Sequence, residues 1–234
     1  CMIKTVILII LSVCSPLFAQ MNLSDLTQQT RYLVNDTITS RSRFSTTTIE
    51  GWINEGQKIS DVKSQCIQRS YIFTLSTTTI YYQMPDSFIT AYRVTRDSLA
   101  IQEMTPQGLD GRSAQWEDVS GLPTYYFINF SSRTMIGFAP HPTVVTDTAT
   151  IKVDYLSYSN DLTTNSTTYP FNGSTDLYAY HYSLSYYAAY KASIIDERYE
   201  KTKAYLEIFT SMAQMMKETC MQRPNYRPSL IGKQ

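Results

Sequence analysis

The hydrophobic positions of this chain change period twice, from helical spacing to strand spacing and back. Between Thr46 and Cys66, apolar residues recur in steps of three and four, which predicts one stripe of an amphipathic helix. Thr47 followed by Glu50 predicts a capping box at its start. Each of its two glycines costs about 1 kcal/mol relative to alanine in an exposed helix interior, so tertiary packing must hold the helix. The stripe consists of Ile49, Trp52, Ile53, Ile59, Val62 and Cys66.

A shorter helix precedes this one. Ser24 stands before a segment with Asp25 in its first turn and with Leu26 and Leu33 two turns apart, which predicts Ser24 as the N-cap. We expect this helix to end near Asn35-Asp36, and a polar linker to follow it.

From Tyr71 the apolar period becomes two, as in β-strands. Apolar residues alternate on both sides of Ser76–Thr79, which predicts a hairpin between the segments around Phe73 and Tyr82. The segments Tyr125–Phe130 and Thr134–Phe138 predict a second hairpin. Pro106–Gly111 has the composition of a turn.

The clearest strand runs from Thr148 to Tyr155, with one apolar and one polar side. Further strand-like segments flank Asp97-Ser98. Short strands separated by turns predict a small antiparallel sandwich or barrel. The apolar side of the clearest strand consists of Ala149, Ile151, Val153 and Tyr155.

The helical period returns after a polar loop that ends at Thr175. We expect Asp176 to cap a helix, and a break near Asp196-Glu197 to start the last helix, which has a heptad-like seam. The expected buried face of the first of these helices holds Leu177, Tyr180, Leu184, Tyr187, Ala188 and Lys191, with Ala192 and Ile195 extending its apolar edge. The seam of the last helix consists of Tyr199, Leu206, Phe209, Ala213, Met216 and Cys220.

The order of these elements predicts an α+β fold: a discontinuous helical bundle with an inserted antiparallel β-sandwich or barrel-like domain. Residues 21–70 and 170–220 would form the bundle, and residues 71–158 the insertion. Residues 221–234 contain Pro224 and Pro228, so we expect an extended C-terminal tail. Residues 1–20 have the order of a secretory signal peptide, with Met21 as an alternative start preceded by upstream translated sequence.

Composition excludes few classes of function. The formal net charge is zero, so the chain lacks the basic excess typical of proteins that bind nucleic acid or anionic membranes. The 19 tyrosines suit protein interfaces or carbohydrate binding. Cys66 and Cys220 each end an expected helix, and their spacing fits no metal site. Two buried free thiols are the prediction, with a disulfide as the alternative if the chain is exported.

Catalytic motifs are absent from the sequence. His141 lies between prolines and His181 lies in a tyrosine-rich segment, where we expect a core or interface histidine with its hydrogen bonds satisfied. We predict no enzymatic activity, no cofactor and no metal site.

The string Trp52 to Gln57, WINEGQ, follows a short first helix and resembles the head-to-tail adaptor (connector) proteins of tailed bacteriophages, especially short-tailed ones. Further similar motifs follow in order. They are the Leu75–Pro85 segment, Met104-Thr105-Pro106 leading to Leu109-Asp110, Trp116, Gly121 to Tyr126, Ile136 to Pro140, and a final helix pair divided near Asp196-Glu197.

This resemblance implies a virion structural protein that forms a ring, usually dodecameric, beneath the portal and supports the tail. It implies that the portal protein, tail proteins and further copies of the chain are partners, that DNA is only passing cargo, and that no membrane is involved. The protein would lie at the head-tail junction, and in the host cytoplasm during assembly. The interface residues that we predict are Trp52, Gly56, Arg223, Tyr226, Arg227, Leu230 and Ile231.

Besides a hydrolase that would depend on His181, the alternative hypothesis is an exported β-sandwich module that binds a glycan or a protein. It rests on the signal-like leader and on the tyrosines, and it would place the protein in an extracellular or periplasmic compartment. The two hypotheses differ in whether the leader is used, because adaptors of this family begin close to Met21.

Overall fold

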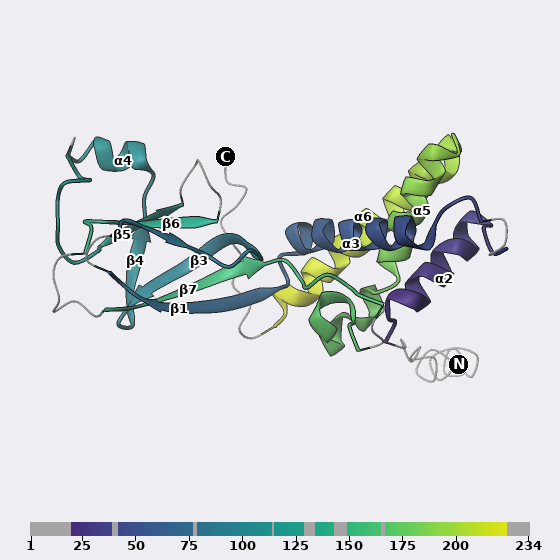
Figure 1. The fold of residues 1–234 in the computed structure, drawn as a ribbon, viewed down its shortest axis with the longest axis horizontal. Coiled ribbons are helices and arrows are strands. Elements are labelled where there is room, and N and C mark those ends of the chain that lie inside the picture. The colour runs from purple at the N-terminus through teal and green to yellow at the C-terminus, as the bar shows by residue number, and fades with distance from the viewer. Residues whose placement is uncertain are drawn as a thin grey trace, which may run out of the picture.

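The computed structural model describes residues 20–38, 42–76, 79–113, 115–128, 134–142, 149–164 and 167–223. The helices are α2 (Leu23–Val34), α3 (Thr46–Ser64), the short α4 (Pro106–Asp110), α5 (Ser183–Ile195) and α6 (Tyr199–Met221), with 3-10 helices η2 (Pro170–Gly173) and η3 (Thr175–Tyr180). The strands are β1 (Gln68–Thr74), β2 (Tyr81–Gln83), β3 (Phe88–Arg96), β4 (Leu99–Glu103), β5 (Tyr125–Ile128), β6 (Met135–Ala139) and β7 (Thr150–Ser157). Helices α2, α3, α5 and α6 lie at one end, and the strands, together with the short α4, lie at the other (Figure 1).

Helix α5 is the centre of the helical part, because α2, α3 and α6 all pack against it. Its alanines allow this close packing, since Ala188, Ala189 and Ala192 are fully buried. The helical core contains Leu23, Leu26, Val34, Phe44, Ile49, Ile53, Cys66, Ile67, Leu162, Phe171, Leu177, Leu184, Ala188, Ala189, Ala192, Met216 and Cys220.

Both expected N-caps are wrong by two residues. Asn22 caps α2: its Oδ1 accepts the Asp25 N–H at 3.0 Å, and the Asp25 carboxylate accepts the Asn22 N–H at 2.9 Å. Ser45 caps α3 by accepting the Thr48 N–H at 3.0 Å. Several Ser, Thr, Asn and Asp residues stand close together at each helix start, and because all four types are favoured at the N-cap, the sequence does not show which of them caps the helix. The predicted end of α2 is confirmed, with Asn35 in the left-handed conformation at φ 56°.

The buried face of α3 differs from the predicted apolar stripe in its second half. Val62 is 45 % exposed, whereas Gln57, Ser60, Asp61 and Ser64 are buried. Gln57 and Asp61 form hydrogen bonds with the chain that follows β7, whereas the Ser60 and Ser64 hydroxyls have no partner among the described atoms. The Gln57 Nε2 donates to the Asn160 carbonyl at 2.8 Å, and Asp61 accepts the backbone N–H and the hydroxyl of Ser159 at 2.7 and 2.9 Å.

The seven described strands form one curled mixed sheet in the order β1-β7-β3-β4-β5-β6-β2, shaped like half a barrel. This confirms the α+β class. The β5–β6 hairpin is confirmed, although its expected tip lies outside the described residues. The pair β4–β5 is parallel, which differs from the antiparallel expectation. The predicted apolar side of β7 is confirmed, since Ala149, Ile151, Val153 and Tyr155 are buried.

The predicted hairpin between the Phe73 and Tyr82 segments is wrong. β1 pairs with β7, and β2 pairs with β6. Alternating apolar residues identify a strand but not its partner, and here the two segments are not ladder partners, although the Phe73 and Tyr82 rings stack at 5.0 Å between centroids.

Two motifs of the β part have clear packing roles. Pro106–Asp110 forms a helical turn with Thr105 as its cap, where a plain turn was expected. Trp116 packs edge-on against Phe127 and donates its Nε1–H to Asp110 at 2.8 Å.

A Cβ atom on Gly137 would lie 2.3 Å from the Phe127 ring, so this position requires glycine.

The last helix pair is divided as predicted, between Ile195 and Tyr199. Asp176 does not cap α5, because it lies in η3 and α5 starts only at Ser183. Ile195 is 61 % exposed, so it does not extend the buried edge of α5. The seam of α6 is buried from Phe209 to Cys220, whereas Tyr199 and Leu206, its first two residues, are exposed.

Cys66 and Cys220 form a disulfide, so the prediction of free thiols is wrong. The C-terminal ends of α3 and α6 meet, with 5.6 Å between the two Cα atoms, which lies within the usual range for a disulfide. Both residues are buried. Helical periodicity places each cysteine on a buried face, but their distance depends on how the helices pack.

We expect the double variant Cys66→Ser/Cys220→Ser to lose about 2–5 kcal/mol of unfolding free energy, because the bond joins residues separated by 154 positions. Urea unfolding with and without dithiothreitol measures this. The reductant should destabilise the wild-type chain and leave the double variant unchanged. Equal stability of the two oxidised proteins would contradict the structural role of this bond.

Two buried groups should give opposite pH dependences of stability. Burial raises the pKa of the Asp61 carboxyl to about 7, despite hydrogen bonds from Ser159 and nearby positive charges on Arg69 and Lys58. Burial also lowers the pKa of the His181 imidazole to about 4, although its Nδ1 accepts the Met21 N–H at 3.3 Å. The folded chain therefore keeps both groups neutral between about pH 4 and pH 7.

The sign of each group's contribution to the free energy of unfolding follows from the difference in proton binding between the folded and unfolded states. The folded state retains the Asp61 proton that the unfolded state loses, so this contribution falls as pH rises from about 4 to 7. The unfolded state binds a proton at His181 that the folded state refuses, so this contribution is lost as pH falls from about 6.5 to 4. Each slope approaches about 1.4 kcal/mol per pH unit, and the two largely cancel.

We therefore expect Asp61→Asn to become markedly less stable on acidification from pH 6.5 to 4, and His181→Asn to become more stable over the same range. Urea unfolding at a series of pH values measures both slopes, which do not depend on the overall cost of either substitution. Parallel profiles for the two variants would disprove the opposed contributions.

Candidate interaction surfaces

The structure describes three of the seven predicted interface residues. Trp52 is half-buried, packs against the helical core, and meets the Phe44 ring edge-on at 5.4 Å between centroids. Gly56 is buried against α5. Tyr226, Arg227, Leu230 and Ile231 lie outside the described residues.

Arg223 follows the end of α6 and makes three contacts within the chain. Its Nε donates to Asp176 at 2.6 Å, its Nη1 to the Cys66 carbonyl at 3.2 Å and its Nη2 to the Ser174 hydroxyl at 3.5 Å. Partial burial acts to raise the pKa of Asp176, but the hydrogen bonds from Arg223 and Ser174 outweigh it, so this pKa lies below its usual value. Arg223 thus ties the end of α6 to η3 and to the end of α3.

The two glycines of α3 have different surroundings. A Cβ atom on Gly56 would lie 2.8 Å from Cδ1 and 3.0 Å from Cβ of Tyr187, so α5 approaches the α3 backbone closely there. A Cβ atom on Gly51 would meet nothing within 4 Å. Among the described residues, another helix thus approaches the α3 backbone closely at Gly56 but not at Gly51.

The C-terminal end of α2 and the break between α5 and α6 lie at the end of the helical part that points away from the sheet (Figure 1), and both segments carry exposed apolar residues. Arg43 joins the elements there, because it binds Asp196 at 2.5 Å and the Val34 carbonyl at 2.8 Å. Tyr199 is 76 % exposed and Ile195 is 61 % exposed. We call this surface the distal helical end, and it consists of Tyr32, Ile38, Ile194, Ile195 and Tyr199.

Sequence reasoning missed the distal helical end. Its one sequence signal is Ile194-Ile195 directly before the break at Asp196, because two adjacent residues of a helix cannot both lie on a narrow buried stripe. Whether Ile194 and Ile195 are exposed depends on how α2 packs beside the α5–α6 corner, which only the structure shows.

The opposite end of the molecule carries a small apolar hollow of about 130 Å³ beside α4. Trp116 and Tyr125 contribute aromatic walls, and the Arg112 guanidinium lies over the Tyr125 ring, 5.0 Å from its centroid. Nearby, Leu122 is 52 % exposed and Val119 is 44 % exposed. We call this surface the β tip; it is formed by Leu109, Arg112, Ser113, Trp116, Val119, Leu122, Tyr125, Ala139 and Pro140.

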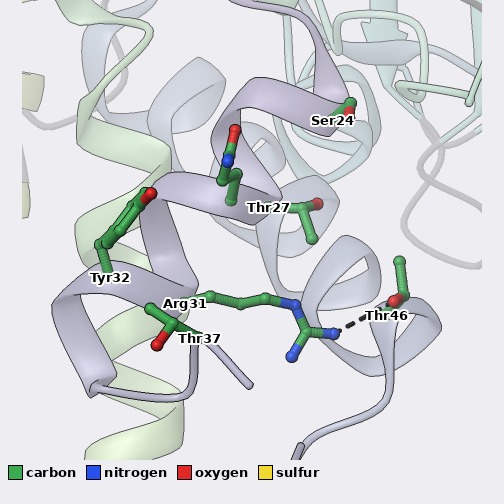
Figure 2. A pocket seen from close by; sticks show the side chains of 7 residues that line it. Ser24, Thr27, Arg31, Tyr32, Thr37 and Thr46 are labelled. Carbon is green, nitrogen blue, oxygen red and sulfur yellow. Dashed lines mark hydrogen bonds between the residues drawn. The ribbon is translucent and has the colours of Figure 1, made fainter. Parts of the chain in front are cut away.

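A third feature is a polar pocket of about 290 Å³ between α2 and the start of α3 (Figure 2). The Arg31 side chain runs along it and donates to the Thr46 hydroxyl at 3.1 Å. The same guanidinium donates to Asp36 and to the Phe44 carbonyl. The residues lining this pocket are Ser24, Thr27, Gln28, Arg31, Tyr32, Thr37 and Thr46.

Within the described ranges, no group of three His, Cys, Asp or Glu side chains could hold a metal ion. His181 is buried as expected, but its Nε2 has no hydrogen-bond partner among the described atoms, so the expectation of full satisfaction is not met. None of the described helices is long and apolar enough to cross a membrane.

Comparison with known proteins gives one finding. The model of the SU10 adaptor protein family matches residues 21–229, which leaves out only residues 1–20 and 230–234. No curated protein is detectably similar to the chain.

The two glycines of α3 provide a matched pair of variants. Gly51→Ala should stabilise the protein by about 1 kcal/mol, because it removes the entropic cost of glycine where space is open. Gly56→Ala should destabilise it by about 1–3 kcal/mol, because the methyl group would displace Tyr187, and Gly56→Leu should impair folding further. Thermal unfolding of the three variants measures this; stabilisation by Gly56→Ala would refute the packing role of Gly56.

Proposed function

Because the chain belongs to the SU10 adaptor protein family, the head-tail adaptors of tailed bacteriophages, we propose that it forms a ring beneath the portal and joins the capsid to the tail. The family agrees with the resemblance found in the order of the sequence motifs, and it makes the protein a structural component of the virion. Head-tail joining requires one subunit to contact different proteins at its two ends.

The separation of the distal helical end from the β tip is the observation that carries this proposal (Figure 1). Both surfaces expose large apolar side chains, and such patches typically mark protein interaction sites. A subunit with one such surface at each end is suited to bridging two partners.

In this proposal the distal helical end meets the portal and the β tip meets tail components. The C-terminal tail, with Tyr226, Arg227, Leu230 and Ile231, joins the portal contact. Copies of the chain associate side by side into a ring, dodecameric in keeping with the family, with Trp52, Gly56 and Arg223 supporting the surfaces between neighbours. DNA passes through the ring as cargo.

The bundle and its insertion serve this arrangement as two units. We propose that residues 21–70 and 170–220 form the portal-side domain and that residues 71–158 form the tail-side domain. The separate apolar clusters of the helical and β parts support this division.

Charged substitutions should separate the two contacts. We expect Ile195→Glu to weaken co-sedimentation with purified portal at least about tenfold, which corresponds to 1.4 kcal/mol. Leu122→Glu should still bind the portal, but it should yield virions that lack tails. Ile72→Glu, at a 60 % exposed isoleucine on β1, is the matched control and should retain both activities.

Electron microscopy of the portal complexes then tests the ring directly. An annulus of subunits on the portal supports the proposal. A chain that stays monomeric with portal present and is absent from virions would overturn it, and loss of portal binding only in Leu122→Glu would reverse the assigned orientation.

A further inference from the structure

We propose that the Cys66–Cys220 pair is a reversible cross-link, present as two thiols while the subunit assembles in the host cytoplasm and as a disulfide after the virion leaves the cell. The reduced pair allows the last turn of α6 to open. The disulfide fixes that turn to the junction of the helical and β parts. The link of the two states to two compartments rests on the proposed function, whereas the opening of α6 does not.

The backbone on both sides of Cys66 is firmly held. Cys66 stands between two buried residues, Gln65 and Ile67. The Gln65 N–H donates to the Asp61 carbonyl at 2.9 Å. The Ile67 carbonyl accepts the Ser157 N–H, also at 2.9 Å. Because these bonds do not involve the sulfur, Cys66 keeps its place when the disulfide is broken.

The last turn of α6 depends on Cys220 for its attachment. Among residues 217–223, all of which are described, only Cys220 is buried. The other contacts of this turn are polar, and in one of them the Tyr180 and Thr219 hydroxyls share a hydrogen bond of 2.6 Å. Arg223 adds an ion pair, but both of its side chains are partly exposed, so the pair is weak. Without the disulfide this turn opens separately from the rest of the fold, because it has few buried contacts.

The fold also accommodates the reduced pair. The Cys66 Sγ lies 3.3 Å from the Met216 carbonyl and 3.7 Å from the Ser64 carbonyl, so a thiol at this position has an acceptor for its proton. Cys66 and Cys220 both belong to the apolar core of the helical part, where a thiol packs as a small apolar group. Both oxidation states are therefore compatible with the surrounding side chains.

Oxidation takes place by exchange with a small-molecule disulfide such as oxidised glutathione. In the opened turn the Cys220 thiolate attacks the glutathione disulfide, which forms a mixed disulfide and releases one glutathione thiol. The Cys66 thiolate then attacks the Cys220 Sγ, which forms the protein disulfide and releases the second glutathione thiol. The two cysteines lose two protons and two electrons, and these reduce one glutathione disulfide to two thiols.

Burial makes the oxidised state persistent. Cys66 is 2 % exposed and Cys220 is fully buried, so an external thiol does not reach the closed disulfide. The cytoplasm keeps thiols reduced, whereas disulfides persist outside the cell. The bond therefore forms after release, and it then keeps the helical and β parts in a fixed relation.

The first experiment needs only the purified full chain. The chain is reduced with a phosphine, and peptide mapping follows the rate at which iodoacetamide labels Cys220. We expect this rate to change less than about threefold between 0 and 1 M urea, because the opening of one helical turn exposes little surface. A larger rise would show that only unfolding of the whole chain exposes Cys220, and it would overturn the proposal. Absence of labelling in the folded chain would overturn it too.

Two variants of the last turn test what holds it closed. Arg223→Gln removes the ion pair with Asp176 and should speed labelling of Cys220 in the reduced chain at least about threefold. Gln222→Ala is the matched control and should be labelled as the wild type is, because Gln222 is exposed and its side chain makes no hydrogen bond within the described residues. Equal rates in the two variants would show that another movement exposes the sulfur, which contradicts the opening of this turn.

The second experiment compares the two compartments. Infected cells and released virions are each dissolved in denaturant with a maleimide mass tag, which reports free thiols. We expect Cys66 and Cys220 to be free in the cell and bonded in the virion. The same state in both samples would disprove the reversible cross-link. Absence of the chain from virions would instead refute the proposed function, and the urea dependence of labelling would still decide whether α6 opens.

Discussion

The arrangement of the whole chain depends on the hydrogen bonds between the polar face of α3 and the segment that follows β7. Asn54 exchanges two hydrogen bonds with the backbone of Leu162, at 2.7 and 3.1 Å, and Gln57 bonds both the Asn160 carbonyl and the Phe171 N–H. Asp61 adds the two bonds from Ser159. This segment has no regular partner strand, and its buried backbone groups need these side chains to be satisfied. Because α3 also leads directly into β1, one helix fixes both the entry to the sheet and the exit from it.

The disulfide and Arg223 secure the same junction from the other side. Cys220 on α6 is bonded to Cys66, which lies between α3 and β1, and Arg223 donates to the Cys66 carbonyl. The junction of the helical and β parts is thus held by side-chain hydrogen bonds, a covalent bond and an ion pair with Asp176. Such a junction suits a subunit whose two ends must keep a fixed position relative to each other. It also leaves the exposed apolar side chains at the two ends, where association can cover them.

The motif WINEGQ acquires a specific meaning from these contacts. Trp52 and Ile53 pack in the helical part, Asn54 and Gln57 hold the segment after β7, and Gly56 admits Tyr187. Glu55 accepts the Tyr187 hydroxyl at 2.7 Å and pairs with Lys191 at 3.1 Å. Every residue of the motif therefore has an internal role. The polar pocket and the distal helical end, formed by residues outside this motif, are the surfaces that these contacts position.

The sequence by itself determined the order of helices and strands, the α+β class, the break before Tyr199 and the family, because local periodicity and motif order are properties of neighbouring residues. It did not determine which strands pair, since the alternation in β1 fits β2 and β7 equally well. Nor did it determine the disulfide, the polar buried face of α3 or the exposure of Ile195, each of which depends on distances between residues far apart in the chain. The pocket around Arg31 is of the same kind, because its donors come from two helices and have no shared signal along the sequence. Tertiary packing alone decided these features, since burial of a polar or apolar side chain is set by what lies against it and not by its neighbours in sequence.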